Sequence, residues 1–154
     1  MRIHLYLVPA VVGMLAVGLS FAAEKKIGRS ELPAAVEKTV QEQSVGATVK
    51  GFVKDTTGGK TEYEVEMTIN GLGKDVVIAT DGAVLEVEEE LPQSAVPSAV
   101  LQALTKLAKG GKIVKVESLK KHDKIVSYEA TVTKGARKHE IAVDPDGKSL
   151  HSED

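Results

Sequence analysis

The sequence predicts an α+β protein of two tandem helix-plus-antiparallel-sheet repeats, each ordered α-β-β-β-β, with the helices on one sheet face. Three observations support this. The chain matches itself at an offset of 64 to 65 residues, each copy opens on a short helical pattern after a proline, and each continues as segments that alternate apolar and polar residues. Such alternation is typical of half-buried strands.

The internal repeat is visible in three pairs of segments. A nearly constant offset with one single-residue slip indicates a duplicated unit, and the unit is too long for a solenoid repeat. The matching pairs are "LPAAVEKTV" (32–40) with "VPSAVLQAL" (96–104), "YEVEMT" (63–68) with "YEATVT" (128–133), and "VVIATDGAVL" (76–85) with "IAVDPDGKSL" (141–150).

Each unit is expected to open with a helix, because Pro33 and Pro97 stand where the first turn of a helix tolerates proline. Apolar residues spaced by four then fall on one helix face, which must be buried against a sheet. These residues are Val36 and Val40 in the first unit and Val100 and Leu104 in the second.

Four strands should follow each helix, separated by turns rich in glycine and aspartate such as "TTGGK", "NGLG" and "DPDG". The segment "LPQSAVPSA" (91–99), with two prolines and small residues, reads as the linker between the units, and the acidic run "EVEEE" (86–90) that leads into it is expected to be solvated. The predicted strands are 47–54, 61–70, 74–80 and 83–88 in the first unit and 112–120, 124–133, 137–143 and 148–151 in the second.

The N-terminal segment has the order of a secretory signal. Arg2 precedes a long apolar run that ends in small residues around Ala22 and Ala23. We therefore expect a signal peptide at 1–22, a first repeat at 23–90 and a second at 91–154, which together form one compact domain. An uncleaved membrane anchor is the competing interpretation, because the apolar run is close to spanning length. Cleavage predicts a periplasmic or secreted protein without stable membrane insertion.

Composition narrows the function classes. The chain has no Cys and no Trp, so disulfides and thiolate chemistry are excluded, and few aromatic residues argue against a base-stacking nucleic-acid surface. Charge is divided between the halves. Residues 24–90 carry a net charge of −6, whereas residues 91–154 carry +3. Such asymmetry can steer a partner or dock two lobes, and it also fits two ordinary solvated surfaces.

The alternating strand at 61–69 defines the candidate binding surface. Tyr63, Val65 and Met67 should face the helix, which leaves a row of glutamates on the opposite face. The equivalent positions of the second unit are mostly uncharged, so the acidity is expected to belong to the first unit. The residues predicted to bind a protein partner are Glu62, Glu64, Glu66, Ser127, Glu129 and Thr131.

No constellation of catalytic residues is recognisable. The chain lacks Gly-x-Ser-x-Gly, and its paired carboxylates fall on alternating strand positions, where they are expected to be solvated. His122, His139 and His151 show no metal-ligand spacing, and "DPDG" (144–147) lacks the further acids of a calcium loop. We therefore predict no catalytic residue, no cofactor and no metal site.

The segment "YEVEMTINGLGKDVVIATDGAVLEVEEE" resembles the PepSY pattern: a tyrosine-led alternating strand, a glycine turn, a second strand, then Asp-Gly and a closing strand. Preceded by a helix and doubled, it resembles the β-lactamase-inhibitor-like, PepSY-like family of small exported bacterial proteins, over about 120 residues. The resemblance implies a non-enzymatic protein that inhibits or assists peptidases, with the concave sheet of a β-lactamase inhibitor gripping an enzyme. Those inhibitors have disulfides and aromatic-rich interfaces, which this chain lacks.

The predicted function is therefore binding. The chain is expected to modulate or inhibit a peptidase or another envelope protein through the exposed sheet face, without contacting nucleic acid. Two alternatives stay open. One is a periplasmic sensor that binds a small ligand or a cation on the acidic face, and the other is a structural envelope protein.

Overall fold

A single antiparallel sheet organises residues 24–150, which are the residues that the computed structural model describes. Its eight strands pair in sequence order, each with the next. The predicted signal peptide at 1–22 and His151 lie outside the described residues. The strands are β1 (Lys25–Ile27), β2 (Thr48–Thr57), β3 (Lys60–Ile69), β4 (Leu72–Ala79), β5 (Val84–Glu90), β6 (Lys112–Lys121), β7 (Lys124–Lys134) and β8 (Arg137–Val143).

Two α-helices accompany the sheet, α1 (Ala34–Gln43) and α2 (Ser98–Leu107), each preceded by a short 3-10 turn, Arg29–Glu31 and Gln93–Ala95 respectively. Pro33 and Pro97 occupy the N-cap positions of the helices. Prolines suit these positions because the first amide groups of a helix lack partners within it. Across residues 24–150, no helix has the length and apolar character needed to cross a bilayer.

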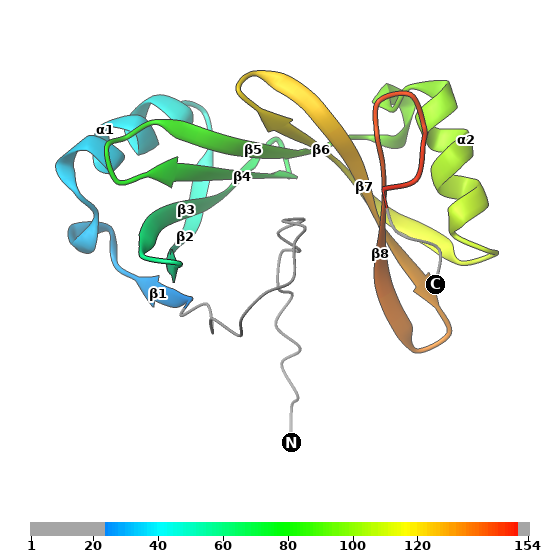
Figure 1. The fold of residues 1–154 in the computed structure, drawn as a ribbon, viewed down its shortest axis with the longest axis horizontal. Coiled ribbons are helices and arrows are strands. Elements are labelled where there is room, and N and C mark those ends of the chain that lie inside the picture. Colours follow the sequence, from blue (N-terminus) through cyan, green and yellow to red (C-terminus); the bar gives the residue numbers. More distant parts are fainter. Residues whose placement is uncertain (1–23, 151–154) are drawn as a thin grey trace.

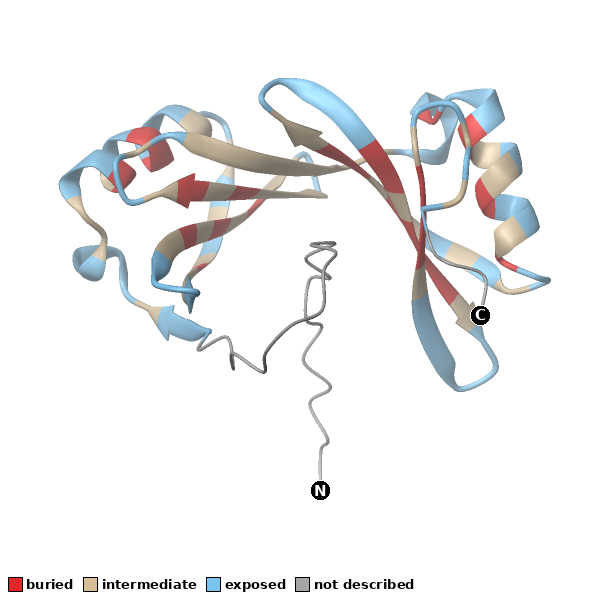
Figure 2. Cartoon of the chain, in the orientation of Figure 1, coloured by how far each residue is buried: buried red, intermediate tan, exposed pale blue. Residues whose placement is uncertain are grey.

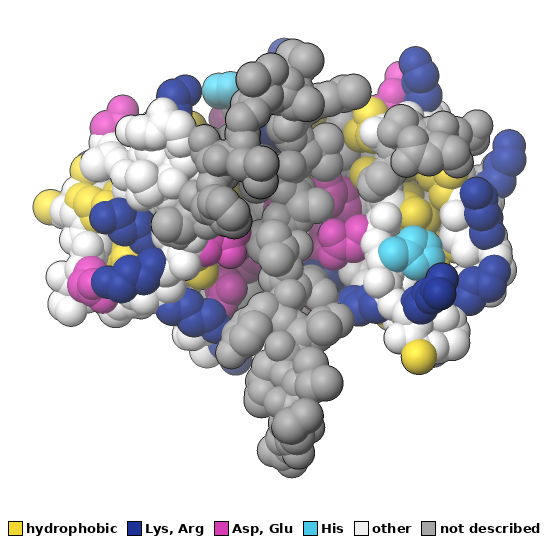
Figure 3. Space-filling view, turned by 60° about the horizontal axis from the view of Figure 1, so that its bottom comes forward, with side chains coloured by type: hydrophobic (Ala, Val, Ile, Leu, Met, Phe, Trp, Pro, Cys, Tyr) yellow, Lys and Arg dark blue, Asp and Glu magenta, His cyan; other side chains and the backbone are white. Residues whose placement is uncertain are grey.

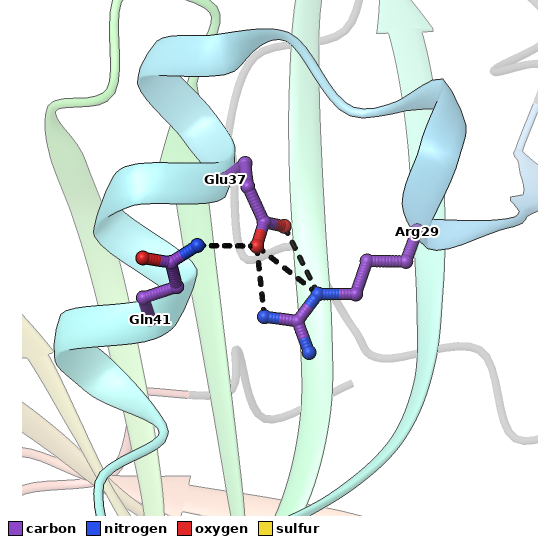
Figure 4. A network of polar contacts seen from close by, with 3 residues as sticks. All are labelled: Arg29, Glu37 and Gln41. Atoms are coloured by element: carbon purple, nitrogen blue, oxygen red, sulfur yellow. Dashed lines mark hydrogen bonds and ion pairs between the residues drawn. The ribbon is translucent and has the colours of Figure 1, made fainter.

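The start of α1 is held by a small polar network (Figure 4). The guanidinium of Arg29 donates hydrogen bonds to the Glu37 carboxylate, with Nη2 2.8 Å from Oε1, and Gln41 Nε2 donates to the same oxygen at 2.8 Å. The hydrogen bond from Arg29 lowers the pKa of Glu37 below its usual value, so this carboxylate stays ionised in acid. The network joins the 3-10 turn to the helix.

Both helices pack on the same face of the sheet and cover its opposite ends (Figure 1). The α1 residues Val36 and Val40 form one cluster with Tyr63, Val65 and Met67 of β3 and with neighbours on β2 and β4. The buried positions in Figure 2 follow this alternation along the strands. The other face of the sheet carries no helix within residues 24–150.

The second core cluster lies under α2. Val100 and Leu104 are fully buried there, against Val116, Tyr128 and Val132 of the β6–β7 pair. Strand register places this cluster on the same face as the first. Val87, which packs against the first cluster, is paired with Lys120 of β6. Val116 lies four residues before Lys120 on the same strand, so it points to the same face, where it belongs to the second cluster. Two separate apolar clusters therefore share one sheet.

The turn between β4 and β5 needs glycine for two reasons. Gly82 has φ +90°, a conformation that side chains disfavour, and a Cβ there would lie 2.8 Å from the carbonyl oxygen of Ala35 in α1. The Gly82 carbonyl also accepts a hydrogen bond of 2.7 Å from Thr39 Oγ1. Asp81-Gly82 therefore forms the turn between β4 and β5, and Gly82 also lets this turn pack against α1.

The predicted architecture of two tandem helix-plus-sheet repeats is wrong. The structure has one eight-stranded sheet with two helices, because β5 continues to Glu90 and pairs with β6 from Glu86↔Lys121 to Glu90↔Glu117. Two separate sheets would each leave a row of unpaired backbone N–H and C=O groups at this boundary. Pairing β5 with β6 satisfies those groups.

Two local predictions fail, and one strand was missed. The acidic run "EVEEE", expected to be solvated, lies within strand β5 and its side chains are partly buried. The strand expected at 148–151 is reduced, within the described residues, to an isolated bridge between Val143 and Ser149. β1 was not predicted, because a three-residue segment is too short to show a period. The two halves therefore differ in their strands.

Candidate functional site: the acidic face of the sheet

All six residues predicted to bind a partner lie on the helix-free face, because they alternate with core residues of β3 and β7. Glu62, Glu64 and Glu66 come from β3, whereas Ser127, Glu129 and Thr131 come from β7. The structure does not bring the two groups into contact. Three strands separate them, so at about 4.8 Å per strand the distance across the sheet is roughly 19 Å.

Further acidic residues fill the space between the two groups. In the register, Glu66 is opposite Asp75, which is opposite Glu88; Glu90 is opposite Glu117, which is opposite Glu129. We use the name acidic face for the set Glu64, Glu66, Asp75, Glu88, Glu117 and Glu129. Figure 3 shows acidic side chains gathered in the middle of this side of the molecule.

The expectation that the acidity belongs to the first half of the chain is therefore wrong. Glu117 and Glu129 come from the second half and are directly opposite one another on β6 and β7. Sequence reasoning missed Asp75, Glu88 and Glu117 because each is unremarkable within its own strand. Only the pairing of β4, β5 and β6 places them side by side. The sequence could have indicated this cluster only if the complete strand order had been assumed beforehand.

Like charges directly opposite each other destabilise a sheet. The chain supplies some compensation from β6, where Lys115 Nζ lies 2.7 Å from Glu117 Oε2 and Lys121 Nζ lies 2.7 Å from Glu86 Oε1. Within residues 24–150, neither Asp75 nor Glu88 forms a salt bridge. The negative charge at the centre of the face is thus only partly balanced.

Three carboxyl groups of the acidic face hold their protons to unusually high pH. Burial, reinforced by neighbouring carboxylates, raises the pKa of Glu88 to about 8, that of Glu64 to about 7 and that of Asp75 to about 6. Burial disfavours the charged form, and nearby like charges add to the effect. The sequence-based expectation that these carboxylates are simply solvated does not hold.

The groups at the rim of this cluster respond in the same sense. Burial, together with Glu140 and Glu117, raises the pKa of Glu129 above its usual value. Burial alone would lower the pKa of Lys115, but its hydrogen bond to Glu117 and the surrounding carboxylates outweigh that effect and raise it. Lys115 therefore stays cationic, and the cluster exchanges protons through its carboxyl groups.

Asp75, Glu88 and Glu117 form the tightest part of the face. Each places a carboxylate oxygen within 4.8 Å of the others. Carboxylate oxygens are the ligands preferred by hard cations such as Ca²⁺, and they also accept hydrogen bonds from Arg and Lys. Among the described residues, His122 and His139 join no group of three metal-capable side chains. Chemically, the face can exchange protons and bind cationic groups.

Comparison with known proteins places the fold but not the family. No protein-family model matches the sequence, and no curated protein matches it. Among solved structures, a proposed periplasmic protein from Bacteroides eggerthii is 18% identical with a TM-score of 0.63, covering 78% of this chain and 86% of that one. A BLIP-like protein from Bacteroides fragilis is 22% identical with a TM-score of 0.57, covering 77% and 84%.

A DUF2874 family protein from Bacteroides ovatus is also similar, at 17% identity and a TM-score of 0.61, covering 78% of this chain and 85% of that one. At this level of identity the likeness concerns the fold alone. The chain thus has a BLIP-like fold, which agrees with the β-lactamase-inhibitor-like part of the sequence resemblance. None of the three is named as a PepSY protein or as an enzyme, so the PepSY part stays a prediction.

Proposed function

We propose that this chain is a non-enzymatic protein of the cell envelope that binds another protein through the helix-free face of its sheet. The observation that supports this most is the acidic face itself. Half-buried carboxylates from five consecutive strands lie on a surface that no helix covers within residues 24–150. Clustering them opposes stability, so the arrangement is better explained by an interaction than by folding.

The class of partner follows from the sequence resemblance and from the fold. A β-lactamase-inhibitor-like, PepSY-like protein is expected to modulate a peptidase or another envelope protein. The B. fragilis structure similar to this chain is named BLIP-like, and the B. eggerthii structure is named as a proposed periplasmic protein. With the signal-like segment at 1–22, these likenesses support placing this chain in the periplasm or outside the cell.

A cavity of about 230 Å³ adjoins the acidic face and gives a partner a place to anchor. It lies where β4 begins and β5 ends, and Glu90 and Lys115 contribute to both the cavity wall and the charged face. Interfaces derive much of their energy from a few side chains held in such sites. The other lining residues are Leu72, Leu91, Pro92, Gln93, Ile113, Val114 and Val116.

The binding function is tested by affinity capture from an envelope extract. Wild-type protein is compared with the triple variant Glu62→Gln, Glu64→Gln, Glu66→Gln and with a control triple that removes the same charge away from the face. We expect the test triple to lose at least about 90% of a captured partner, because each lost charge contact contributes roughly 1 kcal/mol. The control variants are Glu42→Gln, Asp123→Asn and Asp146→Asn.

Equal recovery of every captured protein by the wild type and both triples would contradict the proposed surface. The cation-binding alternative has one observation in its favour, the close approach of Asp75, Glu88 and Glu117. Calorimetric titration with CaCl₂ separates the two functions. Tight calcium binding that Glu117→Gln abolishes, together with unchanged capture by the test triple, would favour the alternative.

A further inference from the structure

The acidic face carries more carboxyl groups than cationic partners within residues 24–150. Lys115 and Lys121 each pair with one carboxylate, Glu117 and Glu86, while Asp75 and Glu88 between them form no salt bridge within residues 24–150. A surface with unbalanced charge of one sign attracts partners of the opposite sign and discriminates against its own sign. The missing charge is positive.

The spacing of the carboxylates indicates the shape of the missing partner. From β3 to β7 the acidic positions extend over four strand intervals, roughly 19 Å at about 4.8 Å each. A single ion cannot contact all of them. An extended protein segment places alternate side chains on one side at intervals of about 6.6 Å. Three such side chains span roughly 13 Å along the backbone, and the length of Arg or Lys side chains lets the outer two reach toward both edges of the acidic face.

We propose that the acidic face binds an extended protein segment that carries several Arg or Lys side chains and crosses strands β3 to β7. This inference depends on the proposed function and adds the chemistry of the partner. Arg fits best, because its guanidinium offers paired donors to carboxylates and is more weakly hydrated than an ammonium group. The carboxyl groups of Asp75 and Glu88, which form no salt bridge within residues 24–150, would be the central contacts.

Binding of this kind is linked to protons. Burial and neighbouring carboxylates raise the pKa of Glu88 to about 8 and that of Glu64 to about 7, so both groups are largely protonated at pH 6. An arriving cation favours the ionised forms, so protons leave as the segment binds. Glu64 is faced by Asp75, Glu66 and Glu24, and Glu88 is faced by Glu117, Glu129, Asp75 and Glu64. The nearby cations Lys115 and Lys121 are paired with Glu117 and Glu86.

The test is calorimetric titration of the whole protein with a blocked hexapeptide that alternates arginine with serine. We expect its affinity to rise about tenfold between pH 6 and pH 8, as roughly one or more carboxyl groups ionise. Measured in two buffers of different ionisation enthalpy, binding near pH 7 should release about one proton or more. A peptide that alternates glutamate with serine should not bind.

Matched variants make the result specific to the face. The double variant Asp75→Asn, Glu88→Gln should weaken arginine-peptide binding at pH 8 by at least about tenfold and remove most of the pH dependence, while Glu42→Gln, Asp146→Asn should change neither. Equal binding by both double variants, or binding without proton release, would overturn the inference. A face-dependent protein captured from extract whose contact segment lacks basic residues would overturn it too, yet leave the proposed function standing.

The two proposals therefore fail separately. Absence of any face-dependent partner in the extract contradicts the proposed function even if the arginine peptide binds. Circular dichroism of each variant is the control for retention of the fold. Gln and Asn replace the ionisable side chains with neutral ones of similar shape. The Asp75→Asn, Glu88→Gln variant should therefore be more stable than the wild type at high pH.

Discussion

Replacing Glu88 by glutamine should raise the free energy of unfolding at about pH 9 by roughly 1–2 kcal/mol and change it little at about pH 5. The pKa of Glu88 is raised to about 8 in the folded protein, chiefly by burial and then by Glu117 and Glu129. A raised carboxyl pKa contributes stability below the unfolded value of about 4.5, and this contribution disappears as pH rises through 8. Glutamine mimics the neutral form at every pH.

The expected change in the free energy of unfolding is well below the value that the full shift in the pKa of Glu88 would imply, because this side chain keeps partial contact with water. Urea unfolding at both pH values measures the effect, and a rise in Tm of about 3–6 °C at high pH should accompany it. Glu42→Gln, on the exposed surface of α1, is the matched control. A gain in stability of the same size at both pH values would contradict the account of this carboxyl group.

Replacing Leu104 by alanine should lower the free energy of unfolding by about 3 kcal/mol. Leu104 is fully buried between α2 and the β6–β7 pair, where it packs with Val116, Tyr128 and Val132. Truncation removes apolar burial and leaves a cavity that the surrounding sheet cannot fully close. Val45→Ala, at a position that is 80% exposed, should stay within about 0.5 kcal/mol.

The same variant tests the continuity of the sheet. Tyr63 lies in the core cluster under α1 and Tyr128 in the cluster under α2. Variants in which Tyr6 and one of these two are replaced by Phe therefore let the remaining tyrosine report on its own half. Because β5 and β6 pair along their length, Leu104→Ala should lower the midpoint for both reporters together. A lowered midpoint for Tyr128 with an unchanged one for Tyr63 would indicate two independent units.

The sequence was most informative where local pattern decides the structure. The alternation at 61–69 gives β3 with its predicted inward set, and the glycine-rich turns fall between the predicted strands. Val36 and Val40 of α1 are buried against the sheet, as their spacing indicates. These features depend on residues that are near one another in the chain, so a single sequence is enough to find them.

Assembly of the strands was not accessible in the same way. The repeat in the sequence suggested two sheets, but the pairing of β5 with β6 is a contact between halves that no local pattern reports. The strand predicted at 83–88 corresponds to β5, but the acidic composition of "EVEEE" does not indicate that the strand continues to Glu90 and pairs with β6. Backbone hydrogen bonding to β6 outweighs the unfavourable charge of this segment.

The candidate site shows the same limit. Glu62, Glu64, Glu66, Ser127, Glu129 and Thr131 follow from alternation alone, and their role in binding remains a prediction. The residues that give the face its unusual protonation lie between them. Asp75, Glu88 and Glu117 become neighbours only through the register of three strands, and their burial depends on the whole sheet.

The most direct test of the electrostatic account is a carbon-detected NMR titration of the side-chain carboxyl groups. Glu88 should titrate near pH 8 and Glu64 near pH 7, since burial beside other carboxylates raises the pKa of each. Glu31 and Glu37, whose pKa values are lowered by hydrogen bonds from Gly28 and Arg29, serve as internal controls and should titrate below 4.5. Midpoints for Glu88 and Glu64 at the ordinary value of 4.5 would contradict the account of the acidic face, in which burial and neighbouring carboxylates raise both pKa values.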